Sequence, residues 1–107
     1  MTAPNHPRTA PLGFAASGDN TAIAAVTGQA LVIWKIALTT HAAVTVTFAS
    51  GAGTGTPLGV YEFTTAGSLV LDGPEGFELY RTAIGALFNM SLSGAVQVNG
   101  TVWYTYG

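Results

Sequence analysis

The feature that most constrains the fold is an alternation of apolar and polar residues along most of the chain. From residue 19 onward Val, Ile, Thr and aromatic residues dominate, and Gly or Asn interrupts them roughly every eight to twelve residues. Within residues 43–50, for example, Val44, Val46 and Phe48 are expected to face a core. This pattern predicts an all-β chain.

Turn signals divide the pattern into about eight short strands. In chain order, the predicted strands span residues 20–27, 29–39, 43–50, 58–64, 68–71, 77–81 and 87–92, with a last strand that ends at Tyr106. A helix is expected nowhere beyond one turn at residues 82–87. About eight antiparallel strands in one chain of this length predict a single β-sandwich or jelly roll, here over residues 19–107.

Two of these strands have features of their own. In residues 29–39, strict alternation places Trp34 and Ile36 on one face and Ile33 and Lys35 on the other. Both faces are largely apolar, which predicts a central strand or one that is buried on both sides. For the last strand we expect one continuous strand with a bulge at Gly100. A hairpin turn at Asn99-Gly100 is the alternative.

Residues 1–18 differ from the rest of the chain and are expected to form an extended N-terminal arm outside the core. The arm contains three prolines, Pro4, Pro7 and Pro11. Their spacing forbids a helix and favours an extended, polyproline-like chain. The alternatives are a poorly ordered terminus and an arm that lies on a neighbouring subunit, with Arg8 and Phe14 as anchors.

The charge content excludes one class of partner and suggests another. Only 7% of residues are charged, against roughly a quarter in an ordinary soluble domain. Three Lys and Arg residues cannot neutralise the several phosphates that a nucleic-acid binder contacts. The longest apolar stretch, residues 30–38, contains Lys35 and is too short to span a bilayer, so no membrane partner is expected. A surface so poor in charge is expected to be covered by protein partners.

The sequence contains few candidates for catalytic or metal chemistry. Cys is absent, and His6 and His41 do not have the spacing of a metal site. The acidic cluster of Asp72, Glu75 and Glu78 is the best candidate for cation binding or for the paired carboxylates of a glycoside hydrolase. It flanks a Gly-Pro turn, however, and lacks the spacing of an EF-hand loop. We therefore expect no metal, no cofactor and no enzymatic activity.

The aromatic residues allow two interpretations. In a charge-poor sandwich, aromatic side chains first suggest core and inter-subunit packing, with Tyr hydroxyls reaching water. The alternative is a sugar-stacking face formed by Tyr61, Trp103 and Tyr104. That alternative requires the three rings to be exposed together.

Four stretches of the chain resemble small virion structural proteins of tailed bacteriophages. They are residues 17–28, 29–38, 43–51 and 85–102, and together they cover most of residues 17–106. The resemblance implies a structural role on the virus particle. The protein would decorate or cement the capsid, or form part of a head fibre or tail appendage.

These observations lead to one expected function and one alternative. The leading hypothesis is a non-enzymatic auxiliary capsid protein on the virion surface, which bridges neighbouring capsomers, as a trimer. Its partners would be the major capsid protein and copies of itself. Deletion of residues 1–17 is then expected to leave folding intact and to weaken shell binding. The alternative is a head-fibre or tail-appendage module that binds a host receptor or glycan.

Overall fold

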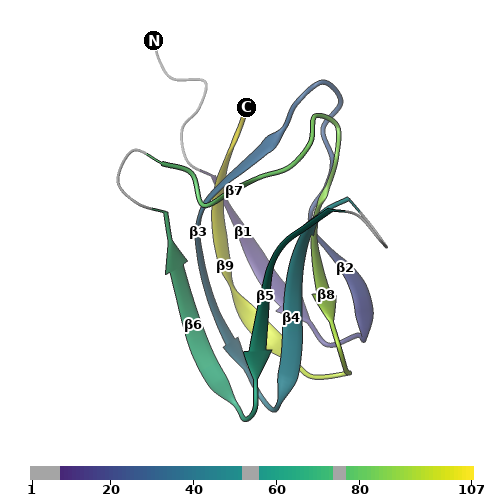
Figure 1. The fold of residues 1–107 in the computed structure, drawn as a ribbon, viewed down its shortest axis with the longest axis vertical. Helices are drawn as coiled ribbons and strands as arrows, with labels where there is room; N and C mark the ends of the chain where they lie inside the picture. The colour runs from purple at the N-terminus through teal and green to yellow at the C-terminus, as the bar shows by residue number, and fades with distance from the viewer. Residues whose placement is uncertain (1–7, 52–55, 74–76) are drawn as a thin grey trace.

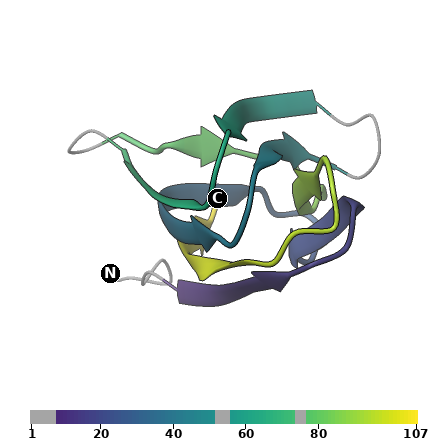
Figure 2. The same ribbon diagram turned by 90° about the horizontal axis from the view of Figure 1, so that it is seen from below.

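The structure is a computed structural model that describes residues 8–51, 56–73 and 77–107. Nine strands in these residues form two antiparallel sheets, and the described residues contain no helix. The all-β expectation is therefore confirmed. Figures 1 and 2 show the two sheets as facing layers, an arrangement compatible with the expected β-sandwich.

Each sheet draws its strands from both halves of the chain. Sheet A has the order β1 (Arg8–Phe14), β9 (Val98–Tyr106), β3 (Leu31–Thr40) and β6 (Gly67–Asp72), and the short β7 (Tyr80–Arg81) also pairs with β3. Sheet B has the order β2 (Gly18–Ile23), β8 (Phe88–Leu92), β4 (Val44–Ser50) and β5 (Thr56–Phe63). Strands that are consecutive in the chain therefore mostly lie in opposite sheets.

The strand pairs are nested along the chain. β4 pairs with β5, β3 with β6, β2 with β8 and β1 with β9, all antiparallel. The pairs β3–β9 and β4–β8 then complete the two sheets. The pattern is that of one long two-stranded ribbon whose successive segments lie alternately in sheet A and sheet B (Figure 1).

The core lies between the two sheets and is formed by the alternate residues that face inward. Its buried members are Leu12, Ile23, Leu31, Ile33, Ile36, Leu38, Val44, Val46, Phe48, Phe88, Met90, Leu92, Val98 and Val102. Phe48 and Phe88 are the largest, and their rings stack with centroids 5.4 Å apart. The inward positions expected for Val44, Val46 and Phe48 are thus confirmed. Burial of apolar side chains from both sheets is the main force that holds the two layers together.

A β-bulge in β3 corrects the expected alternation of this strand. The register between β3 and β9 shifts between Ile33 and Lys35. One extra residue in β3 reverses the phase, so Ile33 and Ile36 both face the core and are fully buried. Trp34 and Lys35 are left on the outer side. The prediction that Trp34 and Ile36 share a face was wrong because strict alternation does not survive a bulge.

The last strand is continuous, as expected, but it has no bulge at Gly100. The register runs unbroken from Lys35 opposite Trp103 to Thr40 opposite Val98, which also excludes a hairpin turn there. Gly100 is needed for a different reason. A Cβ atom at this position would overlap the carbonyl oxygen of Ala37, so only glycine lets the two strands approach this closely.

The expected arm is wrong for its second half, because residues 8–14 form an edge strand of sheet A. β1 pairs with β9 over its whole length, and Leu12 is a core residue with only 2% of its surface exposed. Pro11 is the reason for the wrong prediction, because proline lacks the backbone N–H group that a paired strand normally uses. An edge strand pairs on one side only, so a residue without an N–H group can be accommodated there. Pro4 and Pro7 lie outside the described residues.

Candidate functional site

The outer face of sheet A is arranged in three rows across β1, β9, β3 and β6. The upper row contains Thr9, Trp103, Lys35 and Asp72, the middle row Pro11, Thr101, Ala37 and Val70, and the lower row Gly13, Asn99, Thr39 and Ser68. Side chains two positions apart on a strand share a face, and the core residues occupy the positions between them. These rows are therefore the surface that sheet A turns away from the core.

The middle and lower rows enclose a shallow hollow of about 350 Å³ on this face. β3 runs along its floor with Ala37, whose small side chain leaves the space open. Val70 from β6 is 64% exposed and stands on one side, and Thr101 from β9 stands on the other. Below them Thr39, Ser68 and Asn99 complete the rim. The hollow thus has an apolar floor and an uncharged polar rim.

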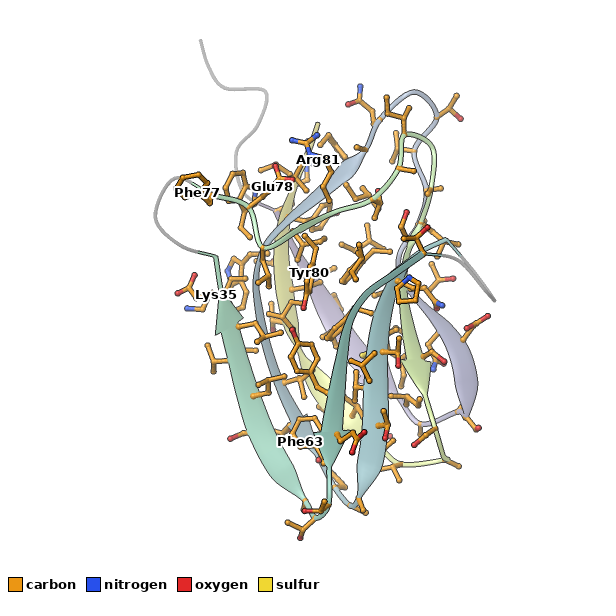
Figure 3. All side chains as sticks on the ribbon, viewed as in Figure 1. Lys35, Phe63, Phe77, Glu78, Tyr80 and Arg81 are labelled. Carbon is orange, nitrogen blue, oxygen red and sulfur yellow. The ribbon has the colours of Figure 1, made fainter. Side chains whose placement is uncertain are left out.

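Two tryptophans and a lysine occupy the surface just above the hollow. The Lys35 ammonium lies 5.2 Å from the centroid of the Trp103 ring, a cation–π contact between neighbouring strands. The Trp34 indole Nε1 donates a hydrogen bond of 2.8 Å to Thr105 Oγ1. The bulge in β3 makes this cluster possible, because it turns Trp34 and Lys35 outward together. Figure 3 shows Lys35 beside the upper end of β6.

Within the described residues, the acidic cluster does not assemble into a paired-carboxylate site. Both carboxylate oxygens of Glu78 accept hydrogen bonds from the Arg81 guanidinium, at 2.8 and 2.9 Å. This bidentate pair raises the pKa of Arg81 (Figure 3). Asp72 lies across from Lys35 in the upper row, and Glu75 lies outside the described residues. The described part of the chain contains no group of three or more His, Cys, Asp or Glu residues that could hold a metal ion.

The three aromatic residues of the expected sugar-stacking face are not brought together. Trp103 lies on the outer face of sheet A, whereas Tyr104, the next residue along β9, packs against the core. Tyr61 packs against the core from β5 in sheet B, with its ring centroid 6.0 Å from that of Phe48. The three rings therefore do not form one face. Burial is the main cause that raises the pKa of Tyr104, and the neighbouring Tyr106 adds to it.

Tyr61 instead joins the two sheets. Its hydroxyl shares a hydrogen bond with the hydroxyl of Tyr80 from β7 in sheet A. Burial is the main cause that raises the pKa of Tyr80, and the bond to Tyr61 adds to it. Figure 3 shows Tyr80 between β3 and β5. A Cβ atom on Gly59 would overlap the Tyr80 hydroxyl, so glycine makes room for this contact.

The residues expected as anchors of the arm belong to β1. The Arg8 guanidinium lies 4.7 Å from the centroid of the Tyr106 ring of the same chain. Phe14 packs against the core, and Pro11 is exposed on the outer face opposite Thr101. They are therefore parts of an edge strand rather than of an arm. Their contact with a neighbouring subunit stays a prediction.

The outer face of sheet B is built differently from that of sheet A. Thr47 of β4 lies between Ser91 of β8 and Val60 of β5, and Val60 is 55% exposed. The next outward residue of β4 is Thr45, opposite Glu62. Small uncharged side chains thus cover the centre of this face.

One polar residue on the outer side of sheet B is buried. Asn89 has 2% of its surface exposed, and its Oδ1 accepts a hydrogen bond from the backbone N–H of Asn20. Its Nδ2 donates to a carboxylate oxygen of Asp19 at 3.0 Å. Asn89 therefore fastens the edge strand β2 to β8, where the register of β2 is irregular.

Sequence patterns indicate Trp103, which lies beside the hollow, but none of the residues that line it. Trp103 was singled out as an aromatic residue, whereas Ala37, Thr39 and Ser68 were not. In the structure each of them lies on the outer side of a strand. Only the register of β9, β3 and β6 shows that they are neighbours.

Comparison with known proteins adds no relative to this description. No protein-family model matches the chain, and neither the curated proteins nor the solved structures give a match. Within the described residues, no helix is long and apolar enough to cross a membrane. The function therefore has to follow from the residues and the fold.

Proposed function

We propose that this chain is a non-enzymatic structural protein of a tailed-bacteriophage virion. It decorates the assembled capsid and cements it by bridging neighbouring capsomers on the capsid surface. Its partners are the major capsid protein and copies of itself, in a trimer. The resemblance of residues 17–28, 29–38, 43–51 and 85–102 to small virion proteins supports this role, and so does the strand order described above.

The nested strand order is the observation that carries the proposal. With β7 set aside, the ribbon of four nested strand pairs gives the orders β1-β9-β3-β6 and β2-β8-β4-β5. We infer that this is a jelly roll, the double-sheet fold in which a long ribbon is rolled into two four-stranded layers. Jelly rolls form capsid and lectin domains of viruses and other sources.

The outer face of sheet B is the surface we assign to the shell. Its centre of Thr45, Thr47 and Ser91 has no charged side chain, and the centre of a protein interface is typically depleted of charge. Val60 is an exposed apolar side chain in this face and would be covered on docking. Glu62 lies at its margin, where polar residues are usual.

The effect on the capsid follows from mass action. A protein that binds neighbouring capsomers only when they are assembled stabilises the assembled state in proportion to the binding sites it occupies. A trimer needs two different patches on each copy that fit each other. The edge strands of the two sheets, β1 and β6 in sheet A and β2 and β5 in sheet B, provide such patches.

Co-sedimentation with shells assembled from the major capsid protein tests this proposal. The wild-type protein is expected to pellet with the shells, and Val60→Lys is expected to bind at least about tenfold more weakly, because docking would bury an unpaired ammonium. Ile84→Lys is the matched control. Ile84 is 74% exposed in the segment between β7 and β8, outside the strands of sheet B. Failure of the wild-type protein to pellet would contradict the proposed function.

The alternative of a head-fibre or tail-appendage module that binds a receptor or glycan loses its expected site. Tyr61 and Tyr104 pack against the core. Of the three residues, Trp103 alone lies on an outer face. A glycan site on this chain would have to be built around Trp103 from other residues.

A further inference from the structure

We infer that the hollow on the outer face of sheet A binds a neutral saccharide. This inference goes beyond the proposed function and does not depend on it, because it concerns the face opposite to the one assigned to the shell. It rests on the shape of the hollow, on the hydroxyl groups around it and on the indole beside it. The charge of the surrounding residues decides which ligand class fits.

The shape of the hollow is set by the backbone. Gly100 lets β9 approach β3 so closely that a Cβ atom would lie 2.7 Å from Leu38 Cα. Ala37 on the central strand has the smallest side chain of its row, so the floor stays low between Val70 and Thr101. Ligand pockets in proteins begin at roughly 300 Å³, and the hollow of about 350 Å³ reaches that size.

The rim offers hydroxyl groups that the protein does not use. Within the described residues, the side chains of Thr39, Ser68 and Thr101 have no hydrogen-bond partner. Each hydroxyl can donate one hydrogen bond and accept two. Asn99 is held in place, because its Oδ1 accepts a hydrogen bond of 2.8 Å from Gln97 Nε2. A ligand rich in hydroxyl groups would find both donors and acceptors here.

An indole and an ammonium border the upper end of the hollow. Trp103 is two residues from Thr101 on the same face of β9, and Lys35 is two residues from Ala37 on β3. Sugar rings carry C–H groups that pack against aromatic surfaces while their hydroxyls bond to polar groups. The Lys35 ammonium, already beside the Trp103 ring, is a donor for a sugar hydroxyl.

The charges around the hollow favour a neutral ligand. None of the residues that line it has a titratable side chain. Lys35 and Asp72 lie opposite each other in the upper row, so the positive charge of Lys35 is accompanied by a negative one. A purely apolar ligand would cover the rim hydroxyls and leave them unpaired, which costs free energy. A neutral molecule with many hydroxyls satisfies both conditions.

Titration of the whole purified protein with neutral tetrasaccharides tests the inference. The probes are tetrasaccharides of α-1,4-glucose, β-1,4-glucose, mannose, galactose and N-acetylglucosamine. Binding is followed by tryptophan fluorescence and by the NMR shifts of backbone amides. At least one probe is expected to shift the amides of Ala37, Thr39 and Thr101. If no probe shifts them, or if the shifts fall only on sheet B, the inference is wrong.

Variants test whether the saccharide binds at the hollow or elsewhere on the surface. Trp103→Ala is expected to weaken binding of the active probe by about tenfold, and Ala37→Leu is expected to abolish it by filling the floor. Thr101→Val keeps the shape and removes a hydroxyl, so it tests the rim without a change of packing. Thr64→Val, in the exposed turn between β5 and β6, is the matched control and should bind as the wild type does. Wild-type affinity in both Trp103→Ala and Ala37→Leu would overturn the inference.

A negative result in the sugar titration and a negative result in the shell experiment are independent of each other. The titration uses the protein alone, whereas co-sedimentation uses assembled shells. Loss of shell binding in Val60→Lys with intact sugar binding would support two separate faces. Sugar binding that disappears with Val60→Lys, in a variant that remains folded, would contradict the placement of the saccharide on sheet A.

Discussion

The two sheets differ in what they turn away from the core, although the same kind of alternating strand builds both. Sheet A displays Trp103, Lys35 and a hollow, and all three Lys and Arg residues of the chain lie on its strands. The centre of sheet B's outer face carries threonine and serine. The inward residues are apolar core side chains in both sheets. The outward residues therefore carry the information about function.

The largest loss of stability is expected from changes to β1, the edge strand of sheet A. Leu12→Ala should lower the free energy of unfolding by about 2–5 kcal/mol, because it leaves a cavity in the core. Deletion of residues 1–17 removes all of β1 and should prevent stable folding, contrary to what an arm outside the core would give. Urea unfolding followed by tryptophan fluorescence measures both. A truncated chain with wild-type stability would show that β1 is not part of the sheet.

A second comparison uses two asparagines on the outer sides of the sheets. Asn89→Ala in sheet B should cost about 1–3 kcal/mol, because it leaves the Asn20 N–H without its acceptor. Asn99→Ala in sheet A should cost less than about 0.5 kcal/mol, because Asn99 is exposed. The midpoint of urea unfolding distinguishes them. Equal costs would mean that the burial of Asn89 does not stabilise β2.

Gly100 in sheet A and Gly59 in sheet B extend the comparison of the two sheets, because a new methyl group would meet different atoms at each position. Gly100→Ala in sheet A should cost about 1–3 kcal/mol, because the new methyl group meets backbone atoms of β3 that cannot move alone. Gly59→Ala in sheet B meets the ends of the Tyr61 and Tyr80 rings, which can shift. It should therefore cost less. Thermal unfolding of the two variants tests this order, and a costlier Gly59→Ala would reverse the account of the two sites.

The smallest effect concerns the tyrosine pair that joins the sheets. The pKa of Tyr80 is raised in the folded state, so the folded chain keeps this proton more tightly than the unfolded chain does. Its contribution to stability is complete below pH 10 and is lost as the pH rises above that value towards the folded pKa. Because the ring is partly exposed to solvent, we expect a loss of only about 0.5 kcal/mol by pH 11.

Urea unfolding at pH 9 and pH 11 measures this loss. Tyr80→Phe has no proton to release at this position, so its stability should change less between the two pH values. Tyr61→Phe removes the hydrogen-bond partner and should fall between Tyr80→Phe and the wild type. An identical pH dependence in all three proteins would contradict the role given to Tyr80.

The sequence predicts most of the inner face of this fold and little of the outer one. Alternation identified Val44, Val46 and Phe48 because a strand without irregularity keeps its phase. The same rule failed for Trp34, since a bulge forms only in relation to the partner strand β9. The edge strand β1 was missed because Pro11 indicates an extended chain whether or not the chain is paired. A local pattern contains no information about pairing.

The candidate site shows the same limit. Trp103 was recognised as a candidate from residue type alone, but it was grouped with Tyr104, whose side chain points to the opposite side of β9. The hollow joins residues from β9, β3 and β6 that are far apart in the chain. Their proximity depends on register, which the nested pairing sets and which no single strand reveals.

The number of copies of this chain per capsid shell protein in purified virus particles tests the central claim most directly. Quantitative mass spectrometry of intact particles provides that ratio. We predict a ratio near one to one, or one to a small whole number, as expected for a protein that covers the whole lattice. A few copies per particle would instead indicate that the chain is located at a vertex, fibre or tail. Absence from the particles would contradict the proposed function.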